Sequence, residues 1–180
     1  MNAKITQYFF TKDSVKANFL YLVSFIFIIF GLLVDPLNQV WDGFLAILTS
    51  PSNLITDYFE VGGIGATFVN AGLLMLINAM AIKRFSTKIT GPLVAALFTV
   101  MGFAFFGKNL YNSIPITIGT LLYSRYRNMP IGNFLLTSLF ATTLAPVVSI
   151  ITFGQGLSYW ISVPLGVLVG VFIGFTIHPM

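Results

Sequence analysis

The stretch that decides the fold is residues 17–34, ANFLYLVSFIFIIFGLLV, which has no charged side chain and is rich in Phe, Ile and Leu. As a helix it would span about 27 Å, close to the roughly 30 Å hydrocarbon core of a bilayer. It is too long for the apolar region of a signal peptide, and no small-residue cleavage site precedes Asp35. We therefore expect a membrane helix that is retained in the protein.

The composition of the whole chain agrees with a membrane location. Hydrophobic residues make up 57% of its 180 residues and charged residues only 8%, whereas soluble domains have about 25% charged residues. The net charge is +4, but the basic residues lie in short clusters between apolar runs, so we expect no nucleic-acid partner. The chain has no cysteine, which excludes disulfides and thiolate metal sites.

We predict an all-α, polytopic integral membrane protein with about six transmembrane helices in one domain, residues 1–180. Stretches of low charge place the spans at residues 16–34, 61–82, 89–107, 109–124, 132–151 and 158–178. The fourth would reach only about 24 Å as a straight helix, so we expect it to be short and re-entrant or broken.

The apolar segment 37–48 is too short to cross a bilayer. We favour a helix on the outer surface over a re-entrant hairpin with residues 53–59, because burying Asp42 in the membrane is costly.

The basic residues predict the orientation, because cytoplasmic loops retain Lys and Arg. With both termini in the cytoplasm, that side holds the basic residues near the span ends: Lys4, Lys12, Lys16, Lys83, Arg84, Lys88, Arg125 and Arg127. The opposite side then holds Asp35, Asp42, Asp57 and Glu60. Lys108 is the one basic residue that does not fit this pattern.

The most informative polar stretch is residues 107–120, GKNLYNSIPITIGT. Asn112 or Ser113 can cap a helix, and Pro115 suits the first turn of that helix. A helix that begins part-way into the membrane presents N–H groups that favour an anion or a polar carbonyl, and Lys108 adds a charge there. The alternative is an external loop before a short tilted span, with Lys108 at the interface.

A second stretch is residues 62–72, GGIGATFVNAG. Its glycines either let another helix approach closely or leave the backbone unwound around a ligand. Thr67 and Asn70 share one helical face, and an Asn in hydrocarbon needs a partner, either on an adjacent helix or in a solute and water. In the last span, Gly166, Gly170 and Gly174 form a ridge of small residues that permits tight packing.

The motifs GGIGATFVNAGLL (residues 62–74) and GKNLYNSIPITIGTLLY (107–123) resemble a family of bacterial multi-pass membrane proteins called domain of unknown function 1576. Members are about twice as long as this chain, so the resemblance implies an N-terminal half of a two-repeat inner-membrane protein and assigns no reaction. The sequence FVNAGLL at residues 68–74 is also similar to the pore motif of urea channels, without the prolines expected there. That similarity implies short half-helices.

These patterns favour a transporter or channel half for a small polar or anionic solute, in the inner membrane. We expect the solute site at Gly65, Thr67, Asn70, Lys108, Asn109, Asn112, Ser113 and Thr117. The expected partners are the lipid bilayer, the solute, and a second copy or second repeat half, with no cofactor and no metal.

We expect no enzyme, because no Walker loop, Gly-x-Ser-x-Gly, His-Glu-x-x-His or pair of carboxylates occurs within a span. The alternative function is a membrane scaffold or assembly subunit that transports nothing and uses the glycine ridge as its interface.

Overall fold

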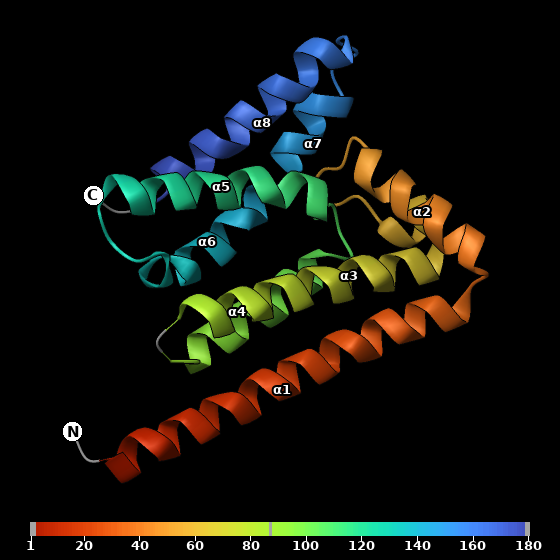
Figure 1. The fold of residues 1–180 in the computed structure, drawn as a ribbon. Coiled ribbons are helices and arrows are strands. Elements are labelled where there is room, and N and C mark those ends of the chain that lie inside the picture. The colour runs from red at the N-terminus through yellow and green to blue at the C-terminus, as the bar shows by residue number, and fades with distance from the viewer. Residues whose placement is uncertain (1–2, 87, 179–180) are drawn as a thin grey trace.

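The computed structural model describes residues 3–86 and 88–178, and this part of the chain folds into eight α-helices and two short 3-10 helices. The α-helices are α1 (Ala3–Val34), α2 (Leu37–Thr49), α3 (Tyr58–Phe85), α4 (Gly91–Phe103), α5 (Leu110–Tyr126), α6 (Leu135–Ala141), α7 (Pro146–Phe153) and α8 (Tyr159–Thr176). Figure 1 shows α1, α3 and α4 in one layer and α5 to α8 in a second, with α2 across one end. The expected all-α fold is confirmed.

Several helices are long and apolar enough to cross a membrane. They are α1, α3 and α8, and the pair α6–α7, bent by 40°, would make a fourth span. The span expected at residues 132–151 is therefore a broken one, interrupted by the 3-10 helix Thr142–Leu144 before Pro146.

The spans expected at residues 89–107 and 109–124 correspond to two shorter helices. The 13 residues of α4 extend about 20 Å and the 17 residues of α5 about 26 Å, both less than the roughly 30 Å of a hydrocarbon core. Residues 104–109, hereafter the α4–α5 turn, join them inside the bundle, and the other ends of both helices lie on the same side (Figure 1).

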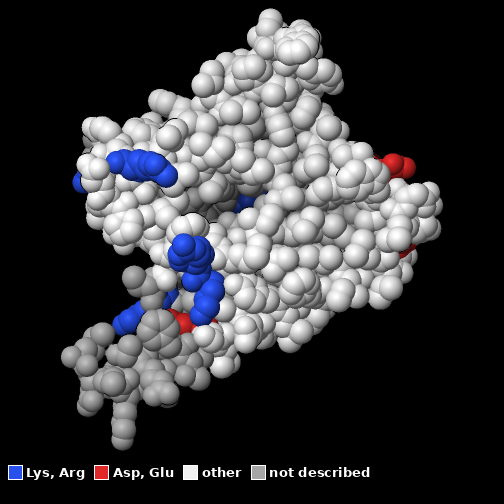
Figure 2. Space-filling model, in the orientation of Figure 1, with Lys and Arg blue, Asp and Glu red and all other residues white. Residues whose placement is uncertain are grey.

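The charged residues separate to opposite ends of the bundle. The basic end carries Lys83, Arg84, Lys88, Arg125 and Arg127, and the acidic end carries Asp35, Asp42, Asp57 and Glu60 (Figure 2). One acidic residue, Asp13, lies with the basic residues, and Lys16 pairs with it at 3.2 Å. The side chain of Lys4 lies outside the described part of the structure.

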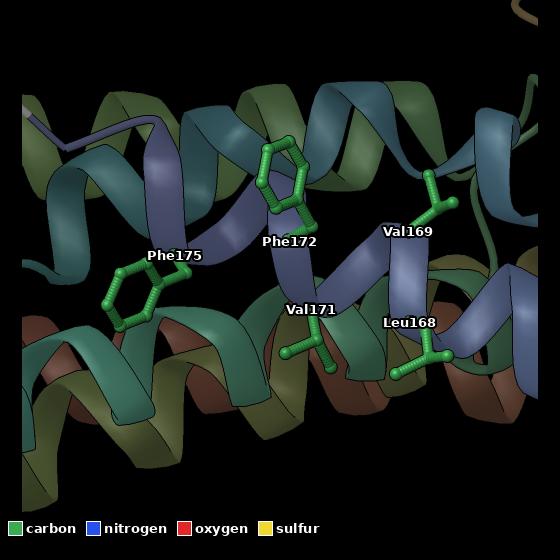
Figure 3. A pocket seen from close by; sticks show the side chains of 5 residues that line it. All are labelled: Leu168, Val169, Val171, Phe172 and Phe175. Atoms are coloured by element: carbon green, nitrogen blue, oxygen red, sulfur yellow. The ribbon is translucent and has the colours of Figure 1, made fainter.

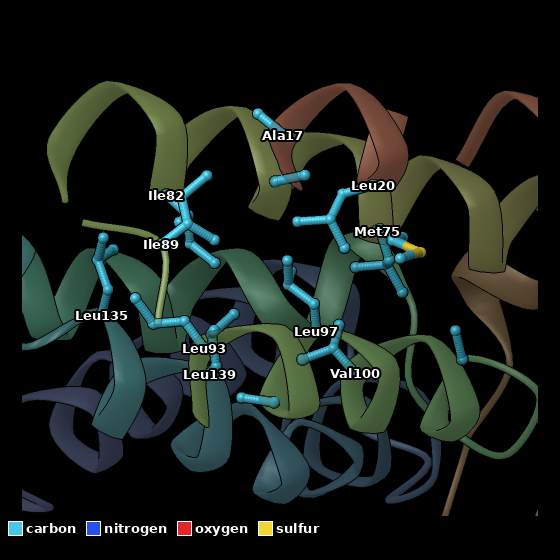
Figure 4. Packing of buried hydrophobic residues seen from close by; sticks show 14 of the residues in the cluster. Ala17, Leu20, Met75, Ile82, Ile89, Leu93, Leu97, Val100, Leu135 and Leu139 are labelled. Carbon is cyan, nitrogen blue, oxygen red and sulfur yellow. The ribbon is translucent and has the colours of Figure 1, made fainter. Parts of the chain in front are cut away.

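The main apolar cluster joins α1, α3, α4 and α6 (Figure 4). Its labelled members larger than alanine are Leu20, Met75, Ile82, Ile89, Leu93, Leu97, Val100, Leu135 and Leu139. Because lipid tails are as apolar as these side chains, close van der Waals packing holds such helices together in a membrane. The cluster fixes α4 against α3 and so positions the α4–α5 turn.

Glycines let α3 approach its neighbours closely. A Cβ added at Gly72 would lie 2.8 Å from the carbonyl oxygen of Ser24 in α1, and one at Gly62 would lie 2.7 Å from that of Gly43 in α2. These distances are shorter than normal carbon–oxygen contacts, so the helices pack backbone to backbone. The expectation of a close helix approach is confirmed.

The glycine ridge of α8 also packs inside the chain. Gly166 faces Thr152 of α7, a Cβ at Gly170 would lie 2.6 Å from the Cβ of Pro115, and one at Gly174 would overlap the carbonyl oxygen of Ile116. The packing role predicted from the spacing is confirmed. The idea that this ridge forms the interface of a scaffold is wrong, because α5 and α7 cover it.

Helix α2 packs against α3, and its expected position on the outer membrane surface stays a prediction. Val40 and Ile47 are buried against the bundle, while Asp42 is exposed. After α2, residues 50–57 run inward as an irregular segment that reaches the α4–α5 turn, where Asp57 forms an isolated bridge with Phe106.

Candidate functional site

The α4–α5 turn has a tightly determined backbone. Gly107 has a φ of 69°, in the left-handed region, and a Cβ at this position would overlap the carbonyl oxygen of Asn53. The N–H of Tyr58 donates to the carbonyl of Phe105 at 3.1 Å. Only glycine combines this conformation with so close an approach, so the segment between α2 and α3 holds the turn in place.

Helix α5 begins with a reciprocal cap. The N–H of Asn112 donates to Oδ1 of Asn109 at 3.0 Å, and the N–H of Asn109 donates to Oδ1 of Asn112 at 2.9 Å. The cap expected at Asn112 or Ser113 is wrong by three or more residues, because Asn109 already has the extended conformation of an N-cap. Pro115 therefore lies inside the helix, and two of the amides expected to hold a solute are occupied.

Lys108 is the only buried lysine or arginine among the described residues, with 1% of its surface exposed. Its Nζ donates to Oγ1 of Thr142 at 2.5 Å, and no described carboxylate forms an ion pair with it. Figure 2 shows basic atoms at the bottom of a hollow in the middle of the molecule, away from the basic end. The alternative of an exposed external loop is wrong.

The partner of Lys108 lies at a second discontinuity. Thr142 is the first residue of the 3-10 helix that separates α6 from α7. Its hydroxyl also donates to the carbonyl of Leu139 at 2.7 Å, so one hydroxyl serves both its own helix and the lysine. Lys108 thus connects the α4–α5 turn with the break in the bent pair.

Asn70 of α3 supports the turn from the other side. Its Nδ2 donates to the carbonyls of Ala104 and Lys108, both at 2.9 Å, so its partner is a neighbouring part of the chain. The side chain is fully buried, and its Oδ1 accepts no hydrogen bond from the described residues. An unpaired buried acceptor costs about 1–3 kcal/mol, and this one belongs to the same amide that holds the backbone carbonyl of Lys108.

Asn109 and Asn112 extend a polar network to three other helices. The Nδ2 of Asn109 donates to the carbonyl of Ile47 at 2.8 Å and to the hydroxyl of Tyr58 at 3.0 Å. The Nδ2 of Asn112 donates to Oγ of Ser149 in α7 at 3.0 Å. A buried network with its donors satisfied rigidifies the elements it joins, here α2, α3, α5 and α7.

The predicted site residues fall into those at the α4–α5 turn and those further along α5 or at the kink of α3. The turn brings together Asn70, Lys108, Asn109, Asn112 and Ser113. Thr117 lies one turn further along α5 and donates to the carbonyl of Ser113 at 3.1 Å. Thr67 and Gly65 lie near the kink of α3 described next, where their hydrogen bonds go to Gly63 and Asp35.

Helix α3 is kinked at Gly63, whose φ is 80° and ψ 176°. The N–H of Gly65 donates to Oδ2 of Asp35 at 2.7 Å, and the hydroxyl of Thr67 donates to the carbonyl of Gly63 at 2.7 Å. The carboxylate of Asp35 therefore caps the main segment of α3 after the kink. The expected unwinding around a ligand is limited to one residue, and Asp35 takes the amide at Gly65.

We expect Asp35→Ala to lower the stability of the folded protein by about 1–2 kcal/mol, because the segment after the kink loses its charged cap. The measurement is thermal unfolding of purified protein in detergent. Asp42→Ala is the matched control, since Asp42 is an exposed acidic residue of the same end and should change stability by no more than about 0.5 kcal/mol. Equal effects of the two substitutions would contradict the capping role.

Sequence reasoning missed four residues of these sites: Thr142, Ser149, Tyr58 and Asp35. The pair Thr142-Thr143, four and three residues before Pro146, was an available signal, since polar residues shortly before a proline indicate a helix break in an apolar run. Among residues 3–86 and 88–178, no group of three His, Asp or Glu side chains lies close enough to hold a metal ion.

The apolar helices and the interrupted elements around a buried lysine define a polytopic, all-α membrane protein. A family model described as a protein of unknown function (DUF1576) matches residues 36–180. The chain belongs to this family, and both motifs that carried the resemblance lie within the matched range. No curated protein and no solved structure matches the chain.

Proposed function

We propose that the chain forms a transporter or channel half for a small polar or anionic solute, with Lys108 at the centre of its binding site. The observation that carries the proposal is the buried Nζ of Lys108, which contacts the hydroxyl of Thr142 and pairs with no described carboxylate. A buried amino group without an opposite charge is costly inside a membrane protein, and such groups mark solute and ion pathways.

The position of Lys108 among interrupted helices supports this proposal. The α4–α5 turn connects two short helices, and the α6–α7 pair breaks at Thr142. Asn70 of α3 donates a hydrogen bond to the turn. Irregular backbone at membrane depth is tolerated where protein buries it or where it lines a water-filled cavity. Secondary transporters build their solute sites from discontinuous helices of this kind.

The polar groups at the turn favour an anion that also carries a hydrogen-bond donor. The Nζ of Lys108 would attract its negative charge, and the unpaired Oδ1 of Asn70 would accept its proton donor. The α5 amides contribute less than the sequence suggested, because the Asn109–Asn112 cap occupies two of them. The proposed action is binding and passage, with no catalytic step.

The proposed orientation places the basic end in the cytoplasm of the inner membrane, since Lys and Arg are retained there. The hairpin of α4 and α5 then enters from the cytoplasmic side and turns back at Lys108. A second half or a second copy of the chain would complete the pathway.

Cysteine labelling in intact cells tests whether water reaches this position, because the chain has no native cysteine. We expect Lys108→Cys to react slowly with a small membrane-impermeant thiol reagent and not with a bulky one. Ile55→Cys, at a position 85% exposed between α2 and α3, should react quickly with both, and Leu97→Cys, at a fully buried position, with neither.

Two outcomes would contradict the proposal. Rapid labelling of Lys108→Cys by both reagents would place the residue on an open surface. No labelling at all, in cells where Ile55→Cys reacts, would mean that no aqueous path reaches the lysine. Failure of Ile55→Cys to react in intact cells, with reaction after permeabilisation, would reverse the proposed orientation.

A further inference from the structure

An aromatic cluster lies at the basic end between α5 and α8, away from Lys108. Tyr123 is at its centre, with the ring of His178 stacked on it at 4.8 Å and the edge of Phe175 at 5.5 Å. The guanidinium carbon of Arg127 lies 6.0 Å from the centre of the Tyr123 ring. This cation–π contact places the exposed guanidinium beside the cluster.

The cluster forms one wall of a pocket of about 490 Å³. The pocket is lined by Tyr123, Tyr126, Arg127, Phe175, Thr176 and His178. Burial lowers the pKa of His178, against a smaller opposite effect of a hydrogen bond to the backbone of Gly174, which favours the uncharged ring. Arg127 is therefore the charged group of the pocket, and no described carboxylate pairs with it.

An apolar groove of about 500 Å³ runs along the outer face of α8. Leu168, Val169, Val171, Phe172 and Phe175 line it, and Figure 3 shows these side chains in two rows along the helix. Leu168 and Phe172 are 65% and 67% exposed, so no other part of the described chain covers them. Phe175 lines both the groove and the pocket, which makes the two continuous.

We infer that the pocket and the groove together bind one anionic phospholipid, with its phosphate at Arg127 and an acyl chain along α8. The order of the two parts matches a lipid, because the charged pocket lies at the basic end and the groove extends from it towards the middle of α8 for about 12 Å. Basic pockets between helices at a membrane surface bind anionic headgroups.

Charge favours a lipid over the other possible occupants. Two copies of the chain inserted in the same orientation would place basic end beside basic end, so a second copy offers Arg127 no opposite charge from Asp35, Asp42, Asp57 or Glu60. Free phosphate would fill the charged pocket but leave the groove of α8 without an occupant. This inference does not depend on the proposed transport function.

Native mass spectrometry of the purified full chain tests the inference. The protein would be released from detergent after incubation with equal amounts of phosphatidylglycerol and phosphatidylcholine. We expect a single phosphatidylglycerol to be retained in preference, and Arg127→Gln to weaken this retention about fivefold, the effect of one basic residue near a membrane surface. Arg127→Lys should keep most of it.

Arg125→Gln is the matched control, because Arg125 is an exposed arginine of the same end that does not line this pocket. It should leave retention unchanged. Phe172→Ser tests the groove and should also weaken retention. The thermal stability of Arg127→Gln and of Phe172→Ser should stay near that of the wild type, because the side chains of Arg127 and Phe172 are exposed.

Four results would overturn the inference. The first is equal retention of the two lipids by the wild type. The second is equal loss in Arg127→Gln and Arg125→Gln, which would indicate general attraction to charge. The third is displacement of phosphatidylglycerol by inorganic phosphate together with normal retention in Phe172→Ser, which would indicate a site for free phosphate. A dimer that survives in phosphatidylcholine and dissociates on Phe172→Ser would assign the groove to a second copy instead.

Discussion

Gly107→Ala should destabilise the folded protein by about 2–5 kcal/mol and remove most of it from the monodisperse fraction in detergent. Two effects add at this position. The φ of 69° is unfavourable for any residue with a Cβ, and the new methyl would overlap the carbonyl oxygen of Asn53, which belongs to the backbone and has no side-chain freedom. The α4–α5 turn would have to move away from the α2–α3 segment.

Gly156→Ala separates these two effects. Gly156 has nearly the same φ, 65°, but no atom lies within 4 Å of the position its Cβ would take. It should therefore cost only the conformational part, about 1–2 kcal/mol. Thermal unfolding of the two variants in one detergent makes the comparison. Equal destabilisation would mean that the contact with Asn53 does not hold the turn.

Lys108→Met should make the protein more stable while abolishing solute passage. Replacing a buried charged group by an apolar side chain of similar size is often neutral or stabilising by about 1–4 kcal/mol, because the cost of keeping the charge out of water disappears. If Lys108 holds the solute, the same change removes the charge that binds it. A rise in stability with a loss of function distinguishes a binding residue from a structural one.

Thr142→Val is the companion substitution, since it removes the hydroxyl that accepts from Nζ of Lys108. Alone it should destabilise by about 1–3 kcal/mol, because the amino group loses its acceptor. Combined with Lys108→Met it should have a much smaller effect, and the difference measures the coupling of the two side chains.

Passage is measured as efflux of chloride, nitrate, formate and phosphate from proteoliposomes. Wild-type efflux of at least one anion that Lys108→Met abolishes is the expected result. Unchanged efflux in a stable Lys108→Met protein would count against the solute site. Lower stability of Lys108→Met would show that the lysine is held by contacts that methionine cannot replace.

The local composition of the sequence predicted much of the candidate site. The polar residues from Lys108 to Ser113 stand out between apolar spans, and Asn70 stands out within one, so their burial together could be anticipated. The position of the cap could not, because Asn109 and Asn112 are both good capping residues. The choice between them depends on the backbone conformation that Gly107 imposes just before.

The glycines of α8 also show which features the sequence predicts and which depend on the tertiary structure. Their spacing in α8 predicted tight packing, because small residues four apart always lie on one face of a helix. Whether that face meets another protein or the same chain depends on where α5 and α7 lie. Contacts of Gly170 with Pro115 and of Gly174 with Ile116 join segments that are far apart in the sequence.

The sequence by itself determined that this protein is helical, belongs in a membrane, and carries its basic and acidic residues at opposite ends. Each of these follows from the composition of single segments, since a bilayer requires long apolar helices and a charge is costly within one. Tertiary structure alone decided that Thr142 faces Lys108, that Asp35 caps the kink before Gly65, and that Arg127 lies beside the groove of α8. Hydrogen bonds are short and directional, so a partner 30 or more residues away is selected by the packing of whole helices and not by local sequence.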